Sequence, residues 1–281
     1  MQKIAPGVPI SINECTVPVR RILGRNPGPM TGPGTNSYLM GEKRLCLLDP
    51  GPADTVQLQN FMDAIGEREL VYILLTHTHA DHSPAALPLA ELTGAEVVGL
   101  AAPDAPGQDH SFKPQHRWQH GDVLDLGEFS LELIHTPGHV SNHLCYLLRE
   151  EQLLFTGDHV LQGTTPVILP PDGDMAAYLD SLRLLQGRDL LYLAPGHGDL
   201  MSEPQDEIAA LIAHRLKREH KIIHCLRQLA AASLDELVVP VYDDVPPHLI
   251  PWAKKTLLAH LYKLQGESQA TTDGHRWQLA D

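Results

Sequence analysis

The sequence predicts an α/β protein, and three observations lead to this prediction. Apolar runs of strand length alternate with segments that carry helix caps and stops. Clusters of histidine and aspartate follow the ends of several of these runs. With 281 residues and an apolar content of 43%, the chain is long enough for a large α/β domain and a small appendage. It contains no apolar stretch of spanning length, so we predict no membrane segment.

Strands and helices alternate through the first hundred residues. Residues 10–23, 37–49, 70–75 and 95–100 have the content of strands. The first helix is expected from a cap at Asp54 to about Ile65, and the second from Pro84 to Thr93 after a cap at Ser83. The Pro- and Gly-rich residues 26–36 are predicted to form a long loop. This alternation is typical of an α/β layer architecture.

The same pattern continues to about residue 200, after which helices dominate. Further strands are expected at residues 122–126, 129–135, 144–148, 152–155 and 190–194, with a helix at residues 175–186. Beyond Leu200, capping boxes at Ser202 and Ser233 start two helices, another helix covers residues 252–265, and Asp273-Gly274 predicts a hairpin. This order is winged-helix-like. We therefore predict domains at residues 1–202 and 203–281.

Composition narrows the classes of function. The formal net charge of −14 argues against a general binder of polyanions, because phosphate contacts need a basic surface. The four cysteines contain no CxxC pair and are interpreted as reduced thiols. The first residues lack the pattern of a secretory leader, so we expect a cytoplasmic protein.

The segment Thr76-His77-Thr78-His79-Ala80-Asp81-His82 is the main chemical signal. It places four potential metal ligands within six residues, at the predicted end of a strand, where open α/β sheets carry their sites. A pair such as His77 and His79 cannot complete a coordination shell, so distant residues must contribute. The candidates with similar settings are His139, Asp158 and His197. Imidazole and carboxylate together suit zinc, iron or manganese.

Four motifs in this order, His-x-His-x-Asp-His, Thr-Pro-Gly-His, Thr-Gly-Asp and Pro-Gly-His-Gly, resemble the metallo-β-lactamase superfamily. The resemblance covers roughly residues 10–200 and implies a four-layer αββα sandwich with two zinc ions, or iron or manganese. It implies that His77, His79 and His139 hold one metal, that Asp81, His82 and His197 hold the second, and that Asp158 bridges them.

The resemblance also implies roles for neighbouring residues. Asp81 and His197 are the expected catalytic residues, and Asp81 orients the nucleophile. Asp49 resembles the family aspartate that orients the ligands, and a plain turn aspartate is the alternative. His159, which follows Asp158, is expected to lie behind the ligands or to face the substrate.

Additional features resemble the lactamase-beta-like protein 2 branch of the superfamily. These features are the winged-helix-like tail, the Pro- and Gly-rich loop at residues 26–36 and the His214-Arg215 segment of the helix predicted after Ser202. The loop residues expected to contact substrate are Asn26, Pro27, Gly28, Thr35 and Asn36, and the helix residues are His214 and Arg215. A mobile hairpin tip and a solvated helix face are the respective alternatives.

Three functions remain open at this point. The branch resemblance favours a phosphodiesterase of the endoribonuclease type that acts on single-stranded RNA. The acidic charge favours an acyl or thioester hydrolase that is similar to glyoxalase II and acts on a small metabolite; an iron-dependent oxygenase and a β-lactamase are further alternatives. A DNA-binding regulator is disfavoured, because residues 203–281 carry nine Lys/Arg against eleven Asp/Glu, a net charge of −2. The tail is more readily explained by packing on the catalytic domain or by a homodimer.

Overall fold

The computed structural model describes residues 4–12 and 16–280, and these residues divide into two compact units. Cys15 lies outside the described residues, whereas Cys46, Cys145 and Cys225 are buried free thiols. The first unit consists of residues 1–136, 142–165 and 189–204, and the second consists of residues 137–141, 166–188 and 205–281. The second unit therefore takes two segments from before residue 202. The boundary between 202 and 203 stays a prediction about the domains.

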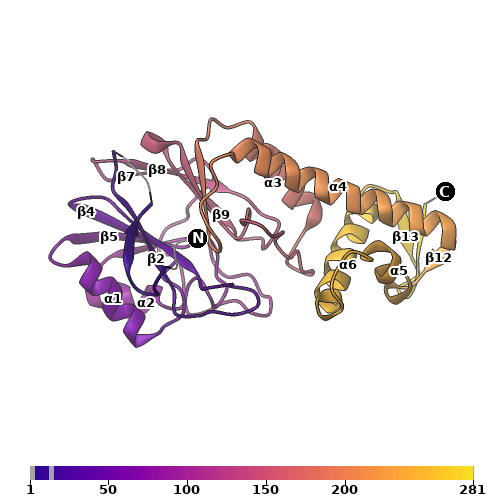
Figure 1. Cartoon of the computed structure of the whole chain (residues 1–281), viewed down its shortest axis with the longest axis horizontal. Coiled ribbons are helices and arrows are strands. Elements are labelled where there is room, and N and C mark those ends of the chain that lie inside the picture. The colour runs from indigo at the N-terminus through magenta and orange to yellow at the C-terminus, as the bar shows by residue number, and fades with distance from the viewer. Residues whose placement is uncertain (1–3, 13–15, 281) are drawn as a thin grey trace. The chain divides into compact units, whose positions relative to one another are not determined.

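Two sheets form the centre of the first unit (Figure 1). The six-stranded sheet runs β1 (Pro9–Ser11), β2 (Val19–Leu23), β3 (Asn36–Met40), β4 (Arg44–Leu48), β5 (Glu69–Leu74) and β6 (Glu96–Val98). The five-stranded sheet runs β11 (Tyr192–Pro195), β10 (Leu153–Gly157), β9 (Leu144–Leu148), β8 (Ser130–His135) and β7 (Val123–Asp125). The pairs β4–β5, β5–β6 and β10–β11 are parallel. All candidate ligands except His139 follow the ends of these parallel strands, which is the usual place for sites in α/β sheets, whereas His139 follows β8.

Apolar side chains from the two sheets share one core. Tyr38 and Leu48 of the first sheet belong to the same buried cluster as Leu133, Tyr146 and Phe155 of the second. The Tyr38 and Phe155 rings lie 5.0 Å apart between centroids. The burial of aromatic and branched side chains between facing sheets supplies most of the stabilisation of such a layer pair.

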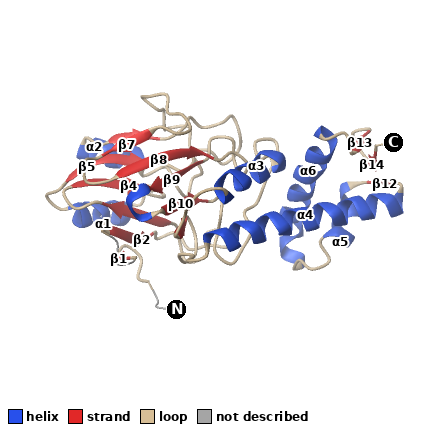
Figure 2. Cartoon of the chain, turned by 90° about the horizontal axis from the view of Figure 1, so that it is seen from above, coloured by secondary structure: helices blue, strands red, loops and turns tan. Residues whose placement is uncertain are grey.

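Two helices cover the other face of the six-stranded sheet (Figure 2). They are α1 (Thr55–Ile65) and α2 (Ala86–Thr93). The predicted cap at Asp54 is confirmed, since its side chain accepts a hydrogen bond from the Gln57 N–H. The predicted start of α2 is wrong by two residues, because the Ser83 hydroxyl donates to Asp109 instead of capping the helix.

The second unit is built from helices and a small sheet. Its elements are α3 (Met175–Gln186), α4 (Pro204–Leu229), β12 (Ala231–Ala232), α5 (Leu234–Val241), α6 (Ile250–Gly266), β13 (Ala270–Thr272) and β14 (Trp277–Leu279). The predicted capping box at Ser233 and the Asp273-Gly274 hairpin are confirmed. At the start of α4, the Gln205 side chain donates to the Arg188 carbonyl, which is not the bond that the predicted capping box requires.

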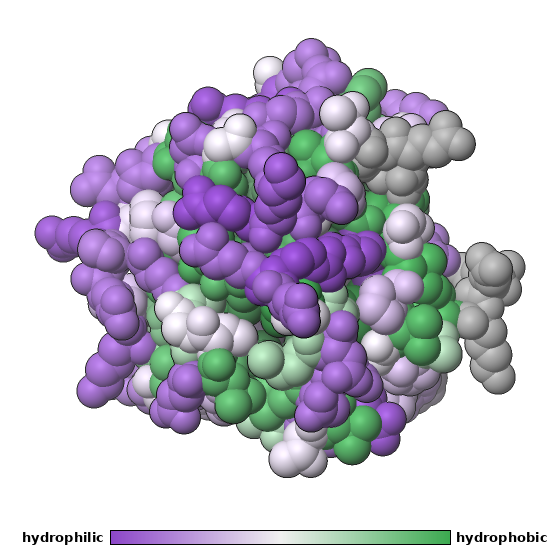
Figure 3. All heavy atoms as spheres, turned by 90° about the vertical axis from the view of Figure 1, so that its left-hand side faces the viewer, coloured by the Kyte–Doolittle hydropathy of each residue, from purple (hydrophilic) through white to green (hydrophobic). Residues whose placement is uncertain are grey.

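One face of the molecule shows the character of the surface. Hydrophilic side chains predominate on the face drawn in Figure 3, which is the left-hand side of Figure 1. His110, His116 and His120, which lie between β6 and β7, are exposed. None of the helices in residues 4–12 and 16–280 has the length and apolar character needed to cross a bilayer.

Candidate metal centre

The loop after β5 is anchored by a buried aspartate. Asp49 is 1% exposed and lies directly after β4, the neighbour of β5. Its carboxylate accepts hydrogen bonds from the Thr76 N–H (2.8 Å), from the Thr76 hydroxyl (2.7 Å) and from Nδ1 of His82 (2.9 Å). Asp49 therefore holds both ends of the ligand-rich loop. Asp49 was predicted from the sequence as a residue that orients the ligands, whereas no role was predicted for Thr76.

The hydrogen bonds assign the proton of His77 to Nδ1. Since the Thr76 hydroxyl donates its proton to Asp49, its oxygen accepts from Nδ1 of His77 at 2.9 Å. The Nε2 lone pair of His77 then faces Nδ1 of His79, 2.9 Å away, with the two rings nearly perpendicular. Metal-binding histidines are typically fixed in this way, with one ring nitrogen tied to an oxygen and the other presented to the metal.

A group of four potential ligands lies entirely within the first unit. One ligand atom each of Asp81, His82, Asp158 and His197 falls within 4.8 Å of the others. Nε2 of His82 lies 3.4 Å from Asp158 Oδ1, and Nε2 of His197 lies 3.3 Å from Asp81 Oδ2. These segments are far apart in sequence, and the turn after β10 and the turn after β11 bring them together with the loop after β5.

The two histidines of this group also present Nε2 inward. Nδ1 of His82 donates to Asp49, and Nδ1 of His197 faces the Gly34 carbonyl at 3.3 Å. Both buried Nε2 atoms lack a hydrogen-bond partner among the described residues. Buried nitrogens that converge on carboxylates fit a divalent cation, so the donor set matches the group that the sequence implies.

Electrostatics in this group favour a positive charge. Burial lowers the pKa of the His82 imidazole, but the Asp158, Asp81 and Asp49 carboxylates outweigh it and raise that pKa well above its usual value. Burial likewise opposes the charged form of Asp81, yet His82 and His197 lower its pKa to about 2. The Asp81 and Asp158 carboxylates thus attract either protons onto the histidines or a metal ion, and the two compete.

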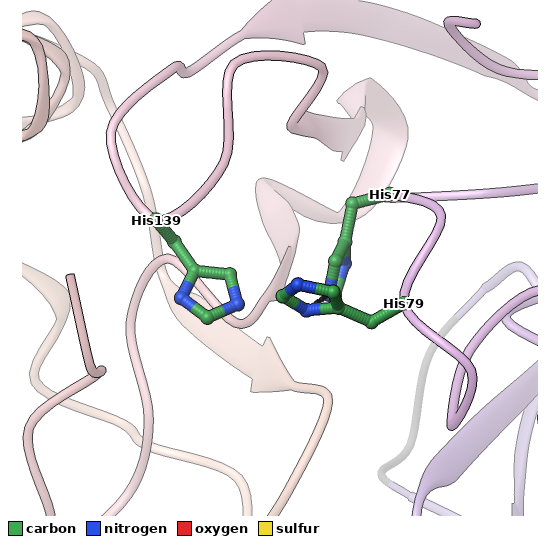
Figure 4. A group of neighbouring side chains, drawn as sticks. All are labelled: His77, His79 and His139. Carbon is green, nitrogen blue, oxygen red and sulfur yellow. Dashed lines mark hydrogen bonds between the residues drawn. The ribbon is translucent and has the colours of Figure 1, made fainter. Parts of the chain in front are cut away.

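A second group of candidate ligands consists of His77, His79 and His139 (Figure 4). Figure 4 shows His77 and His79 on one loop of the first unit. His139 lies in residues 137–141, which belong to the second unit, and its Nδ1 donates to the Val167 carbonyl at 2.7 Å. Its role as the third ligand to the same metal stays a prediction, although its Nδ1 is tied to an oxygen as in His77, His82 and His197.

The predicted substrate loop is ordered by its own polar residues. The Asn26 side chain accepts from the Thr35 N–H and donates to the Thr35 hydroxyl. The Thr35 hydroxyl in turn donates to the Asp81 carbonyl at 2.9 Å. In the part between them, Gly28 pairs with Gly32 through two backbone hydrogen bonds. The loop is therefore fixed against the backbone of a candidate ligand, which the sequence did not predict.

Asn36 holds the last of the candidate ligands in place. Its side-chain amide donates to the carbonyls of Pro195 (3.0 Å) and Gly198 (2.8 Å), and its backbone N–H donates to the Gly196 carbonyl. Thr35 and Asn36 are 0% and 2% exposed. A positioning role for these two residues follows from these contacts, whereas their contact with substrate stays a prediction.

Three other predicted site residues are also placed by the structure. His159 is fully buried, with its ring 5.7 Å from that of His143 between centroids. Arg215 is 3% exposed, donates to the Pro166 carbonyl and lies over the Tyr178 ring at 5.4 Å. His214 is half-buried, and burial lowers the pKa of its imidazole. Their contact with substrate stays a prediction, and the guanidinium of Arg215 is already engaged inside the second unit.

Comparison with known families identifies both parts of the chain. Residues 30–197 match the model of the metallo-beta-lactamase superfamily. Residues 233–277 match the beta-lactamase associated winged helix domain. A crystal structure of a beta-lactamase domain protein from Burkholderia ambifaria superposes with a TM-score of 0.78 over 99% of this chain and 96% of that one. At 17% identity, that similarity supports the fold alone.

Curated relatives carry three kinds of name. The chain is 33% identical to the lactamase-like protein nscB of Arthroderma benhamiae, over 90% of this chain and 59% of that protein. It is 30% identical to an atrochrysone carboxyl ACP thioesterase of Aspergillus chevalieri, over 91% of this chain and 83% of that protein. It is 32% identical to the beta-lactamase-like protein 2 homolog of Drosophila melanogaster, over 92% and 91%.

These matches confirm the predicted fold class, with its αββα sandwich and winged-helix-like tail, and the predicted branch. This chain belongs to the metallo-β-lactamase superfamily, carries the winged helix domain associated with it, and is a hydrolase of that superfamily.

Proposed function

We propose that this protein is a dinuclear metal-dependent hydrolase whose substrates are thioesters. In this proposal His77, His79 and His139 hold one metal, Asp81, His82 and His197 hold the second, and Asp158 bridges the two. The observation that carries it is the convergence of Asp81, His82, Asp158 and His197, with Nε2 of each histidine directed inward. Zinc is the proposed metal, and iron or manganese are the alternatives that this donor set allows.

Asp81 is the proposed base. Divalent metals at such a site lower the pKa of water and polarise a carbonyl oxygen. Asp81 keeps 29% of its side chain exposed while His82 is fully buried, so water and substrate reach the group on the Asp81 side. The Asp81 carboxylate is a hydrogen-bond acceptor on this open side, so it can orient the attacking water and relay its proton onward.

The leaving group favours a thioester over a phosphodiester. Water adds to the carbonyl carbon, the carbon–sulfur bond breaks, and the products are a carboxylic acid and a thiol. A thiolate leaves readily, because thiols have a pKa of about 8.5, and it needs little help from an acid. The group of four offers the ionised carboxylate of Asp81, and a thiolate leaving group does not require a protonated carboxyl beside it.

The comparisons and the charge point in the same direction. One of the relatives described above is named a thioesterase, whereas the names of the three relatives contain no ribonuclease. The net charge of −14 opposes the long run of phosphate contacts that single-stranded RNA would need. The endoribonuclease expectation from the sequence is therefore replaced here by its alternative, the thioester hydrolase.

The test is hydrolysis of a panel of acyl thioesters by zinc-loaded protein, with release of thiol as the readout. Labelled single-stranded RNA and the matched oxoesters are assayed in parallel. We expect thioester turnover that is lost on chelation and in Asp158→Ala, with slower turnover of the oxoesters. Metal-dependent cleavage of RNA without thioester turnover would overturn the proposal.

A further inference from the structure

A fully buried histidine lies among the candidate ligands without belonging to either group. His143 is 0% exposed and stands one residue before β9. Its ring stacks on that of His77, with the centroids 5.3 Å apart. Its Nε2 accepts a hydrogen bond from the backbone N–H of Asp158 at 3.2 Å, and its Nδ1 lies 2.9 Å from the Thr136 hydroxyl.

These contacts determine which nitrogen of His143 carries the proton. A backbone N–H can only donate, so Nε2 must accept and the proton resides on Nδ1. Nδ1 then donates to the Thr136 oxygen, and the Thr136 hydroxyl also lies 3.3 Å from the Cys145 sulfur. His77 and His82 have the same tautomer, and their Nε2 atoms are directed toward other candidate ligands. In His143, by contrast, the Nε2 lone pair accepts the hydrogen bond from the backbone N–H of Asp158.

The turn that carries Asp158 is packed tightly against His143. Gly157 has a φ of +48°, which favours glycine. A Cβ at this position would lie 2.6 Å from the Thr76 hydroxyl and 2.8 Å from His143 Nε2. The backbone therefore passes between Thr76 and His143, and the next residue directs its carboxylate to His82 and His197, at 3.4 and 3.5 Å.

We propose that His143 is a positioning residue that fixes the backbone of Asp158 and thereby the place of its carboxylate between the metals. The proposal rests on the proposed function, because it requires Asp158 to be a ligand. Because the His143 ring accepts a hydrogen bond from the Asp158 N–H, the peptide group before Asp158 cannot rotate freely. The direction of the Asp158 side chain is therefore restricted as well. Residues that orient ligands in this way typically change metal affinity by about 10- to 100-fold when they are removed.

The test compares the zinc affinity of the full chain and its variants by competition with a chromophoric chelator. His143→Phe keeps a planar ring but removes both nitrogens, and we expect zinc binding to weaken by about 10- to 100-fold. His143→Gln restores an acceptor near the position of Nε2 and should recover much of that loss. Thr136→Val removes the acceptor for Nδ1 and should weaken binding by about fivefold, the effect of one lost hydrogen bond.

His260 provides the matched control, because it is an equally buried histidine in the second unit. His260→Phe should lower the thermal stability of the metal-free protein and leave zinc affinity unchanged. If His143→Phe behaves as His260→Phe does, His143 is only structural and the inference is overturned. If His143→Phe does not fold, an unchanged zinc affinity in Thr136→Val decides against the inference. If Asp158→Ala itself keeps full zinc affinity, the proposed function fails instead.

Discussion

Two groups of charged side chains, one in each unit, surround a buried histidine with opposite effects on its pKa. The first cluster is His82 with Asp49, Asp81 and Asp158, and the second cluster is His260 with Glu219 and Lys263. His82 and His260 are both 0% exposed. The carboxylates around His82 raise the pKa of its imidazole well above the usual value, against the effect of burial. Around His260, burial and the nearby Arg215 and Lys263 lower the pKa to about 4, although Glu219 opposes them.

The difference lies in what balances the carboxylates. Glu219 lies 3.8 Å from Nδ1 of His260, but the Lys263 ammonium pairs with it at 2.8 Å. His260 therefore stays neutral beside a compensated ion pair. At the first cluster, Asp81 and Asp158 form ion pairs with His82 and His197. Carboxylates that are paired with histidines attract protons or a metal ion, whereas a carboxylate that is paired with a lysine is already neutralised by a permanent cation.

The largest effect is expected from removing a carboxylate of the first cluster. Asp158→Ala should reduce metal-dependent turnover by at least about 1,000-fold, beyond the 10- to 100-fold typical of residues that only orient ligands. Two measurements check this prediction: the metal content of the purified variant by elemental analysis, and its turnover. Asp125→Ala, at an exposed aspartate of β7, serves as the control and should change neither. Full metal content in Asp158→Ala would mean that the cluster is not the metal site.

The second cluster should make stability depend on pH. The pKa of His260 in the folded protein, about 4, lies below its ordinary value of 6.5, so the unfolded chain binds more protons between these values. Stability is then fully present above pH 6.5 and is lost as the pH falls toward 4, by roughly 3 kcal/mol. Urea unfolding of metal-free protein at several pH values measures this. The loss should shrink in His260→Gln, and an equal loss in both proteins would contradict the assignment.

The next largest effect is expected from the residue that holds the His197 loop. Asn36→Ala removes donors to the Pro195 and Gly198 carbonyls. Zinc affinity should fall by about 10-fold or more, at the lower end of the range for orienting residues. Competition titration measures the zinc affinity, and the thermal stability of the metal-free variant is measured beside it. A stability loss with unchanged zinc affinity would limit Asn36 to a structural role.

The smallest effect is expected from making the second cluster resemble the first. Lys263→Met leaves Glu219 without its cation, so the carboxylate should attract a proton onto His260 and raise the pKa of the imidazole. A rise of about one unit corresponds to about 1.4 kcal/mol. Titration of the ring resonances by NMR measures the pKa. No movement would show that burial alone sets the pKa of His260.

Much of the fold could be predicted from local signals. The helix from Asp54 to Ile65, the capping box at Ser233 and the hairpin at Asp273-Gly274 follow from short-range hydrogen bonds and backbone preferences. Ser83 and Gln205 were mispredicted because each has a partner distant in sequence, Asp109 and Arg188, that outcompetes the local cap. Local propensity cannot anticipate such competition.

The sequence by itself determined the superfamily and the identity of the candidate ligands, because their spacing and order are properties of the chain. Only the tertiary structure decided which nitrogen each histidine presents. The proton positions of His77 and His82 depend on Thr76 and Asp49, and that of His143 depends on Thr136 and Asp158. A hydrogen bond between distant segments forms only after the sheets have assembled. The tertiary structure therefore decides which histidine can be a ligand and which can only position one.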